Sequence, residues 1–219
     1  AARLRRLTEN DEIILFEKGE YISYANCGLP YYIGGTIAER EKLLVQTAEG
    51  FSRRLNVDVR TSQGVVSIDR KAKTVEVRKA DGTSYTETYD KLLLSPRASP
   101  GIDSEGIFTL RNVNDTDRIK AYLTQHTVKR ALIIGGGFIG LEMAENLVEA
   151  GAEVGIVEMA DQVMAPIDYS MASLVHEHLL QKHVRLYLKQ VVSAFQSTPT
   201  GIQVQFASGK SVEADLVIL

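Results

Sequence analysis

The chain has 219 residues, 44% of them hydrophobic and 24% charged, with a formal net charge of −3 at pH 7. This length and composition are typical of one large or two small globular domains, and the near-neutral charge gives no basic footprint for nucleic acid. Because no apolar run approaches the roughly 20 residues of a membrane span, no secretory leader is recognisable and one cysteine allows no internal disulfide, we expect a cytoplasmic protein.

The N-terminal residues predict the second half of a dinucleotide-binding fold. The last turns of a helix are expected over residues 1–8, and a buried strand over residues 13–17 ends in an acid, Glu17. No G-x-G-x-x-G motif precedes this helix. Either the chain begins in mid-domain, which we favour, or Glu17 is only a polar strand end.

The only cysteine, Cys27, stands three residues before Pro30. Proline suits the first turn of a helix, so the sequence predicts that Cys27 lies at or just before a helix N-terminus. Such a position favours the thiolate, which is the reactive form of cysteine. The alternative for a lone cysteine is a small buried hydrophobic residue.

Further elements are predicted before the middle of the chain. A helix is expected over residues 47–55, and an apolar run at residues 92–96 predicts a third buried strand. A linker with Pro96, Pro100 and Gly101 as its breakers follows. Four segments alternate apolar and polar residues and predict a small antiparallel sheet, namely residues 57–60, 65–69, 74–78 and 84–89.

The second half of the chain begins with a helix that Asp115 is expected to cap, ending near residue 125. Residues 130–158 then read as a strand, a tight glycine turn, a helix with apolar residues three and four apart, and a second strand. Gly151 falls where that helix needs a left-handed residue to end it. This order is the dinucleotide-binding unit.

Each position of that unit has a separate physical role. Gly135 permits the sharp turn out of the strand, Gly137 lets the backbone approach a pyrophosphate, and Gly140 lets helix and strand pack closely. The helix N-terminus favours the negative charge of the phosphates. Glu158, at the end of the second strand, can accept both ribose hydroxyls and would repel a 2′-phosphate, which favours NADH over NADPH.

The remaining residues predict a repeat of the same plan. Asp168 is expected to cap a helix to about residue 182, with Leu174 among its inward-facing residues, and a strand follows over residues 184–188. Three further segments alternate in period two, namely residues 191–195, 202–206 and 212–219. The spacing of His176, His178 and His183 argues against a metal site.

The predicted fold class is therefore α/β, with two tandem Rossmann-like domains that each carry an inserted antiparallel β-meander. The expected boundary separates a partial FAD-binding domain with the cysteine, residues 1–112, from an NAD(P)-binding domain, residues 113–219.

Four motifs give the sequence a resemblance to a known family. They are FEKGEYISYANCGLPYYIGG at residues 16–35, YDKLLLSP at 89–96, FTLRNVNDTDRI at 108–119 and ALIIGGGFIGLEMAENL at 131–147. The chain resembles the FAD-dependent pyridine nucleotide–disulfide oxidoreductases of the single-cysteine branch. The SYANC segment is most similar to that of the coenzyme A disulfide reductase group. The resemblance covers nearly the whole chain.

The resemblance implies roles for individual residues. Cys27 would be the redox-active nucleophile. Coenzyme A would contact Arg3, Arg6, Ser23 and Asn26. FAD would contact Glu17, Lys18, Ser95, Pro96 and Glu142. NADH, or NADPH, would bind at Gly135, Gly136, Gly137, Phe138, Ile139, Gly140 and Glu158, with Phe138 as an aromatic gate over the flavin.

The activity implied by the resemblance is electron transfer from NAD(P)H through FAD to a coenzyme A mixed disulfide at Cys27. This would reduce coenzyme A disulfide or a related persulfide or polysulfide, with no nucleic-acid or membrane partner. The full-length protein is expected to be a homodimer. One alternative is an NADH oxidase or peroxidase that uses a Cys27 sulfenic acid.

Some features depart from the family pattern. The first G-x-G-x-x-G, for the FAD pyrophosphate, is missing, and so are the second FAD segment and a dimerisation domain. We therefore expect the chain by itself to bind FAD weakly or not at all and to be inactive. A non-catalytic nucleotide-binding fragment remains a further alternative.

Overall fold

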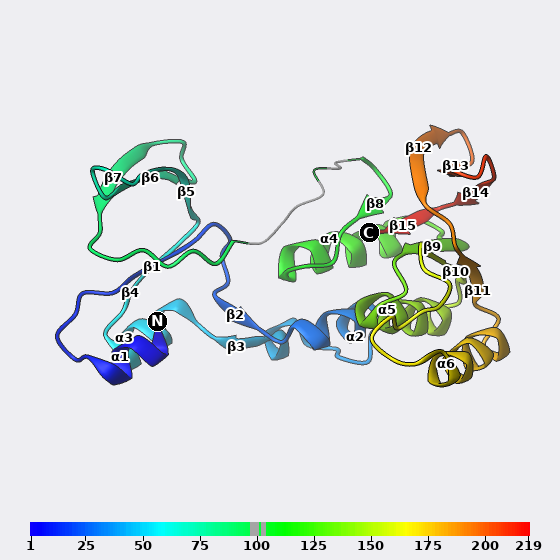
Figure 1. Ribbon diagram of the computed structural model, residues 1–219, viewed down its shortest axis with the longest axis horizontal. Helices are drawn as coiled ribbons and strands as arrows, with labels where there is room; N and C mark the ends of the chain where they lie inside the picture. Colours follow the sequence, from blue (N-terminus) through cyan, green and yellow to red (C-terminus); the bar gives the residue numbers. More distant parts are fainter. Residues whose placement is uncertain (97–100, 102–103) are drawn as a thin grey trace. The chain divides into compact units, whose positions relative to one another are not determined.

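The computed structural model describes residues 1–96, 101 and 104–219 (Figure 1). Most of the predicted linker, including Pro100, lies outside the described residues. The chain forms two compact units, one from Ala1–Ala25 and Leu44–Ser99, the other from Asn26–Leu43 and Pro100–Leu219. The units are thus interleaved in sequence. The expected boundary after residue 112 stays a prediction, because a packing unit and a ligand-binding domain need not coincide.

The first unit contains short helices, two sheets of two strands and one sheet of three strands. β1 pairs in parallel with β4, β2 pairs antiparallel with β3, and β5, β6 and β7 form an antiparallel meander. The bounds are α1 Ala2–Leu7, β1 Ile14–Glu17, β2 Ser23–Tyr24, β3 Leu44–Gln46, α3 Ala48–Leu55, β4 Asp58–Thr61, β5 Gln63–Asp69, β6 Thr74–Lys79 and β7 Ser84–Thr88.

Two predictions for this unit are wrong. Residues 57–60 were expected in the antiparallel sheet, whereas β4 pairs in parallel with β1. Residues 92–96 were expected to form a buried strand, but they are irregular, and Leu93 and Leu94 are 86% and 63% exposed. An apolar run becomes a strand only when another strand takes up its backbone hydrogen bonds, and no described strand pairs with these residues.

The second unit is built on a parallel sheet with the strand order β11-β10-β9-β15-β8 and an antiparallel meander β12-β13-β14 (Figure 1). The helical bounds are η1 Asn26–Gly28, α2 Leu29–Ile33, η2 Arg40–Leu43, α4 Val113–Gln125, α5 Phe138–Glu149 and α6 Tyr169–Gln181. The strands are β8 Ile107–Phe108, β9 Arg130–Ile134, β10 Glu153–Glu158, β11 Arg185–Leu188, β12 Val192–Thr198, β13 Gly201–Phe206, β14 Ser211–Ala214 and β15 Leu216–Ile218.

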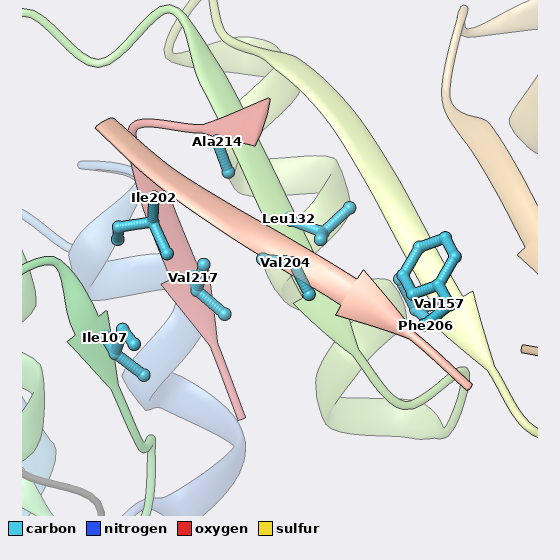
Figure 2. Packing of buried hydrophobic residues seen from close by; sticks show 8 residues of the cluster. All are labelled: Ile107, Leu132, Val157, Ile202, Val204, Phe206, Ala214 and Val217. Carbon is cyan, nitrogen blue, oxygen red and sulfur yellow. The ribbon is translucent and has the colours of Figure 1, made fainter. Parts of the chain in front are cut away.

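The meander packs on the parallel sheet and buries its apolar side chains there. Figure 2 shows Val204 and Phe206 of β13 in one cluster with Leu132 of β9 and Val157 of β10. All four are less than 5% exposed. Parallel strands joined by helices, with a meander inserted before the last strand, confirm the predicted α/β class of two Rossmann-like halves. The carboxyl ends of β9 and β10 lie at the sheet edge where such folds bind ligands.

Residues 212–219 are two strands and not the single strand that the sequence predicted. β14 belongs to the meander, and β15 joins the parallel sheet beside β9. Asp215 lies between them and makes the turn. Its backbone N–H donates to the Arg130 carbonyl at 2.8 Å, and its carboxylate accepts hydrogen bonds from the N–H groups of Lys129 and Arg130. The alternation of apolar and polar residues continues through this turn, so the sequence pattern could not show that the strand is interrupted at Asp215.

The start of α4 was predicted three residues too late, whereas the start of α6 was predicted correctly. Asn112, and not Asp115, caps α4, with its Oδ1 accepting from the Asp115 N–H at 2.7 Å. The Asp115 carboxylate instead accepts from the Arg111 N–H at 3.1 Å. Asp168 occupies the cap position of α6 without a side-chain cap hydrogen bond, and Leu174 is 59% exposed and not buried.

Candidate active site

The glycine turn after β9 has the geometry that close packing and a close backbone approach require. Gly135 has φ +115°, a left-handed conformation that disfavours side chains. A Cβ on Gly140 would lie 2.1 Å from the Gly135 carbonyl oxygen, so only glycine lets α5 start this close to the turn. Gly137 is different: a Cβ there would meet no atom within 4 Å. The space beside Gly137 is therefore open to a ligand.

The open space coincides with the start of α5. Gly137 is the N-cap residue of this 12-residue helix, and no side chain caps it. The first N–H groups of a helix carry a partial positive charge and bind phosphate when no side chain takes them up. The residues present therefore fit the pyrophosphate of a dinucleotide.

Glu158 is fixed beside this turn by two backbone hydrogen bonds. Its Oε2 accepts from the Gly136 N–H and its Oε1 from the Ala160 N–H, both at 2.8 Å. The side chain is half-buried at the end of β10. The glycine turn and the predicted ribose acid are thus brought together.

Phe138 and Ile139 start α5 with exposed side chains, 65% and 56% accessible, and Glu142 follows one turn later, half-buried. An exposed aromatic ring at a helix start has no packing role in the fold. The proposed contacts of these residues with NAD and FAD stay predictions.

Cys27 lies in η1 and its residue is exposed, so the alternative of a buried hydrophobic cysteine is wrong. Pro30 occupies the first turn of α2, as predicted. Helix α2 packs against both α4 and α5. The exposed cysteine residue is therefore followed by a helix that packs against two others.

Two polar contacts hold this segment on α4. Lys120 donates from Nζ to the Tyr32 carbonyl at 2.9 Å and lies 3.7 Å from the centre of the Tyr32 ring. Arg40 binds both carboxylate oxygens of Asp117, at 2.6–3.0 Å. The sequence analysis missed these pairs, since partners 77 or more residues apart leave no local signal.

Helix α5 presents carboxylates to Tyr31, a residue of α2 that the sequence analysis also missed. The carboxylate of Glu145, partial desolvation and the carboxylate of Glu142 raise the pKa of the Tyr31 hydroxyl, and Cys27 and Glu149 contribute less. The hydroxyl therefore stays protonated at neutral pH and can donate a hydrogen bond. The spacing of Glu142, Glu145 and Glu149 on one helix face was the available signal.

The predicted residues of the first unit lie at strand ends and on α1. Glu17 ends β1, half-buried, and its Oε1 accepts from the Gly19 N–H at 2.7 Å, while Lys18 beside it is exposed. Ser23 is half-buried in β2. The exposed members of the predicted set are Ser95, Pro96, Arg3, Arg6 and, in the second unit, Asn26.

Arg5, between the two predicted arginines, has a structural role. Its guanidinium donates to the carbonyls of Leu55, Thr8, Glu9, Asp11 and Asn56 at 2.6–3.2 Å. It thereby ties α1 to the end of α3. Arg3 and Arg6 are exposed, and their proposed contact with coenzyme A stays a prediction.

None of the helices in the described part of the chain combines the length and the apolar character needed to cross a bilayer.

Three known proteins resemble this chain over its full length. Coenzyme A disulfide reductase of Staphylococcus haemolyticus (strain JCSC1435) is 36% identical over 222 residues, covering 100% of this chain and 50% of that protein. The crystal structure of reduced Bacillus anthracis CoADR-RHD has a TM-score of 0.90 and 52% identity, covering 100% of this chain and 40% of that one. A NAD-dependent persulfide reductase from A. fulgidus has a TM-score of 0.86 and 34% identity, covering 99% and 42%.

The chain spans about half the length of the curated relative it matches. The profile of the pyridine nucleotide-disulphide oxidoreductase family matches residues 1–219, the whole chain. Together with the glycine turn, Glu158 and the exposed cysteine, this match shows that the chain belongs to the pyridine nucleotide-disulphide oxidoreductase family.

Proposed function

We propose that this chain supplies the nicotinamide-nucleotide site and the redox cysteine of a flavoprotein that reduces coenzyme A disulfide or a related persulfide. The observation that carries the proposal is the placement of Cys27. This exposed residue precedes α2, and α2 packs against α5, the helix whose N-terminus closes the glycine turn. The similarity to a coenzyme A disulfide reductase and a persulfide reductase supports the choice of substrate class.

The nucleotide would be held by residues of the second unit. The open face of Gly137 and the N-terminus of α5 would bind the pyrophosphate, and Glu158 would accept the ribose hydroxyls. Because both Glu158 oxygens are already oriented by backbone N–H groups, its charge stays beside the ribose and would repel a 2′-phosphate. We therefore propose NADH as the preferred donor.

FAD would contact Glu17, Lys18, Ser95, Pro96 and Glu142, and coenzyme A would contact Arg3, Arg6, Ser23 and Asn26. When bound, NADH supplies a hydride and FAD relays its two electrons. Glu17 is held ready by the Gly19 N–H. Glu17 would thus provide an acid for the FAD ribose.

The sulfur chemistry would centre on Cys27. Its thiolate attacks one sulfur of the disulfide, forming a Cys27–coenzyme A mixed disulfide while the other coenzyme A leaves as a thiolate and takes up a proton from solvent. Two electrons and one proton then break the mixed disulfide, returning the Cys27 thiolate and releasing the second thiol. In sum, one disulfide, one NADH and one proton give two thiols and NAD⁺. One cysteine suffices because the substrate supplies the partner sulfur.

Thiol release tests this proposal. The chain is incubated with coenzyme A disulfide alone, and the free thiol released as the mixed disulfide forms is measured against Cys27→Ser; a parallel incubation adds NADH and FAD. We expect the substitution to remove thiol release while NADH still binds, because the two sites use different residues. Undiminished thiol release by Cys27→Ser would contradict the role of Cys27. NADH consumption driven by oxygen or peroxide, without thiol release, would favour the oxidase or peroxidase alternative.

A further inference from the structure

The segment that follows β10, residues 159–168, is here called the β10–α6 loop. It lies directly on the glycine turn. The Met164 N–H donates to the Gly136 carbonyl at 2.8 Å, and Val163 beside it is fully buried. A Cβ on Gly136 would lie 2.8 Å from Val163 Cγ1, so the two backbones approach as closely as glycine allows.

Gly136 also contacts the ribose acid. Its N–H donates to Glu158 Oε2, and the other oxygen of Glu158 accepts from Ala160, the second residue of the β10–α6 loop. Gly136 therefore connects the loop through its carbonyl and Glu158 through its N–H. A shift of the loop would move both groups that orient the Glu158 carboxylate.

The conformation of the loop depends on contacts outside it. Met164 has φ +55°, a left-handed conformation that is unfavourable for a side chain as large as methionine. The bonds to Gly136 and from the Ile167 N–H to the Met164 carbonyl, at 3.0 Å, hold it there. Such a conformation persists only while neighbouring groups fix it.

His176, on α6, supplies one of these neighbouring groups. Its Nε2 accepts the Val163 N–H at 3.1 Å. A ring nitrogen that accepts a hydrogen bond carries no proton, so the proton of the neutral imidazole is on Nδ1. The ring is half-buried and packs edge-on against Tyr169, with centroids 6.2 Å apart. Without this acceptor, the N–H of a fully buried residue would have no partner, which is costly.

We propose that His176 is a positioning residue for the nicotinamide-nucleotide site. Its Nε2 anchors Val163, the next residue Met164 holds Gly136, and Gly136 orients Glu158 toward the ribose. His176 itself touches no substrate. This inference rests on the proposed NADH site, and it adds a residue on α6 that the glycine fingerprint does not contain.

The test compares NADH dissociation constants, measured by the fluorescence of bound NADH, for four proteins. His176→Leu removes the acceptor, whereas His176→Gln places an amide oxygen where Nε2 lies. We expect about tenfold or greater weakening in His176→Leu, the range for a buried donor that loses its acceptor, and near-normal affinity in His176→Gln. His178→Leu, an exposed histidine on the same helix, is the matched control and should bind normally.

The outcomes separate this inference from the proposed function. If the unaltered chain does not bind NADH, the nucleotide site itself is wrong. If it binds and His176→Leu binds equally well, or if His176→Gln is as weak as His176→Leu, the positioning role is overturned. His176→Asn, whose shorter amide cannot reach Val163, replaces His176→Leu if that variant does not fold. If His176→Leu and His176→Asn both unfold while His176→Gln folds, the positioning role is also overturned, because His176 would then support the whole unit.

Discussion

Gly137 is the N-cap residue of α5 and Gly140 lies in the first turn of this helix, but their surroundings differ. Gly137→Ala adds a Cβ that meets nothing, so stability should stay within about 0.5 kcal/mol while NADH binding weakens, because the methyl group occupies the pyrophosphate side. Gly140→Ala forces a Cβ against the Gly135 carbonyl and should destabilise the fold by about 1–3 kcal/mol. Urea unfolding and NADH titration of both variants measure the two effects.

Loss of stability in Gly137→Ala, or unchanged NADH affinity, would show that the open face of this glycine does not bind the nucleotide. Gly140→Ala serves as the control for a purely structural effect of an added methyl group in the same turn.

The sequence identified those residues whose role is encoded in local spacing. The glycines, Glu158 and Cys27 fall within short motifs, and the structure places each of the three groups in the second unit, with the glycines and Glu158 in direct contact. His176 was considered only as a metal ligand and dismissed. Its bond to Val163 depends on how the β10–α6 loop folds back, which no pattern of residue types specifies.

At the scale of elements, the contact between α2 and α5 depends on one glycine. A Cβ on Gly34 would lie 2.1 Å from Asn146 Oδ1 and 2.8 Å from Asn146 Cβ. Asn146 is 1% exposed, and its Oδ1 is the one buried side-chain oxygen or nitrogen without a hydrogen-bond partner among the described residues. Its Nδ2 donates to the Glu142 carbonyl at 2.8 Å. The cysteine segment is thus held against α5 by a tight steric fit.

A double-mutant cycle tests this fit. Gly34→Ala should destabilise the protein by about 1–3 kcal/mol, since the new methyl group overlaps the Asn146 side chain. Asn146→Ala removes Oδ1, the closest of these atoms, and with it the unpaired oxygen, but it keeps a Cβ 2.8 Å from the new methyl group, so Gly34→Ala should cost less, though not nothing, in that background. Free energies of unfolding in urea give the four corners. Additive effects would mean that the two residues do not interact as the structure shows.

The turn between β14 and β15 predicts a pH dependence of stability. Burial alone would raise the pKa of the Asp215 carboxyl, but hydrogen bonds from the Arg130 side chain and from the N–H groups of Arg130 and Lys129 outweigh it and lower the pKa below 3.8. A lowered pKa stabilises the folded state above the unfolded value of 3.8, and this stabilisation is lost as the pH falls through the folded pKa.

Asp215→Asn should therefore lower the free energy of unfolding by about 1–3 kcal/mol at pH 7, the range for hydrogen bonds to a charged group. The difference from the unaltered protein should shrink below pH 3.8. Urea unfolding at pH 7 and at pH 3 measures it. An equal difference at both pH values would exclude the carboxylate charge as the cause.

Most helices and strands could be predicted because the spacing of their apolar residues in the sequence matches the positions that are buried in the structure. The strand–turn–helix–strand unit around the glycines forms as expected, since its apolar runs are buried in a sheet and its helix ends at a left-handed glycine, Gly151. The failures are at residues whose state depends on distant partners. Residues 92–96 have the composition of a strand, but no described strand pairs with them. Asn112 and Asp115 are both residue types that cap helices, and only the structure shows that Asn112 caps α4.

At the scale of the whole molecule, the chain contains two units with one plan. The sequence predicted two Rossmann-like halves that each carry a meander, as the structure confirms, and it placed one domain boundary after residue 112, which stays a prediction. In the structure, Asn26–Leu43 packs with the C-terminal half. This exchange is carried by α2 and by the Arg40–Asp117 and Lys120–Tyr32 pairs, whose partners are far apart in sequence.

The assignment of Asn26–Leu43 to the second unit bears on the proposed function. The segment that carries the thiol belongs to the unit that contains the glycine turn and Glu158. The proposed electron acceptor and the proposed NADH site therefore belong to one folded unit, even though about 100 residues separate them in the sequence.

The proposed role of Cys27 can be tested by whether this residue forms a mixed disulfide with coenzyme A. The purified, folded chain is incubated with coenzyme A disulfide without reductant, and its intact mass is measured beside that of Cys27→Ser. We expect the mass of the chain to increase by one coenzyme A moiety. Dithiothreitol should reverse this increase, and Cys27→Ser should not show it. A folded chain whose mass does not change in excess coenzyme A disulfide would contradict the proposed role of Cys27.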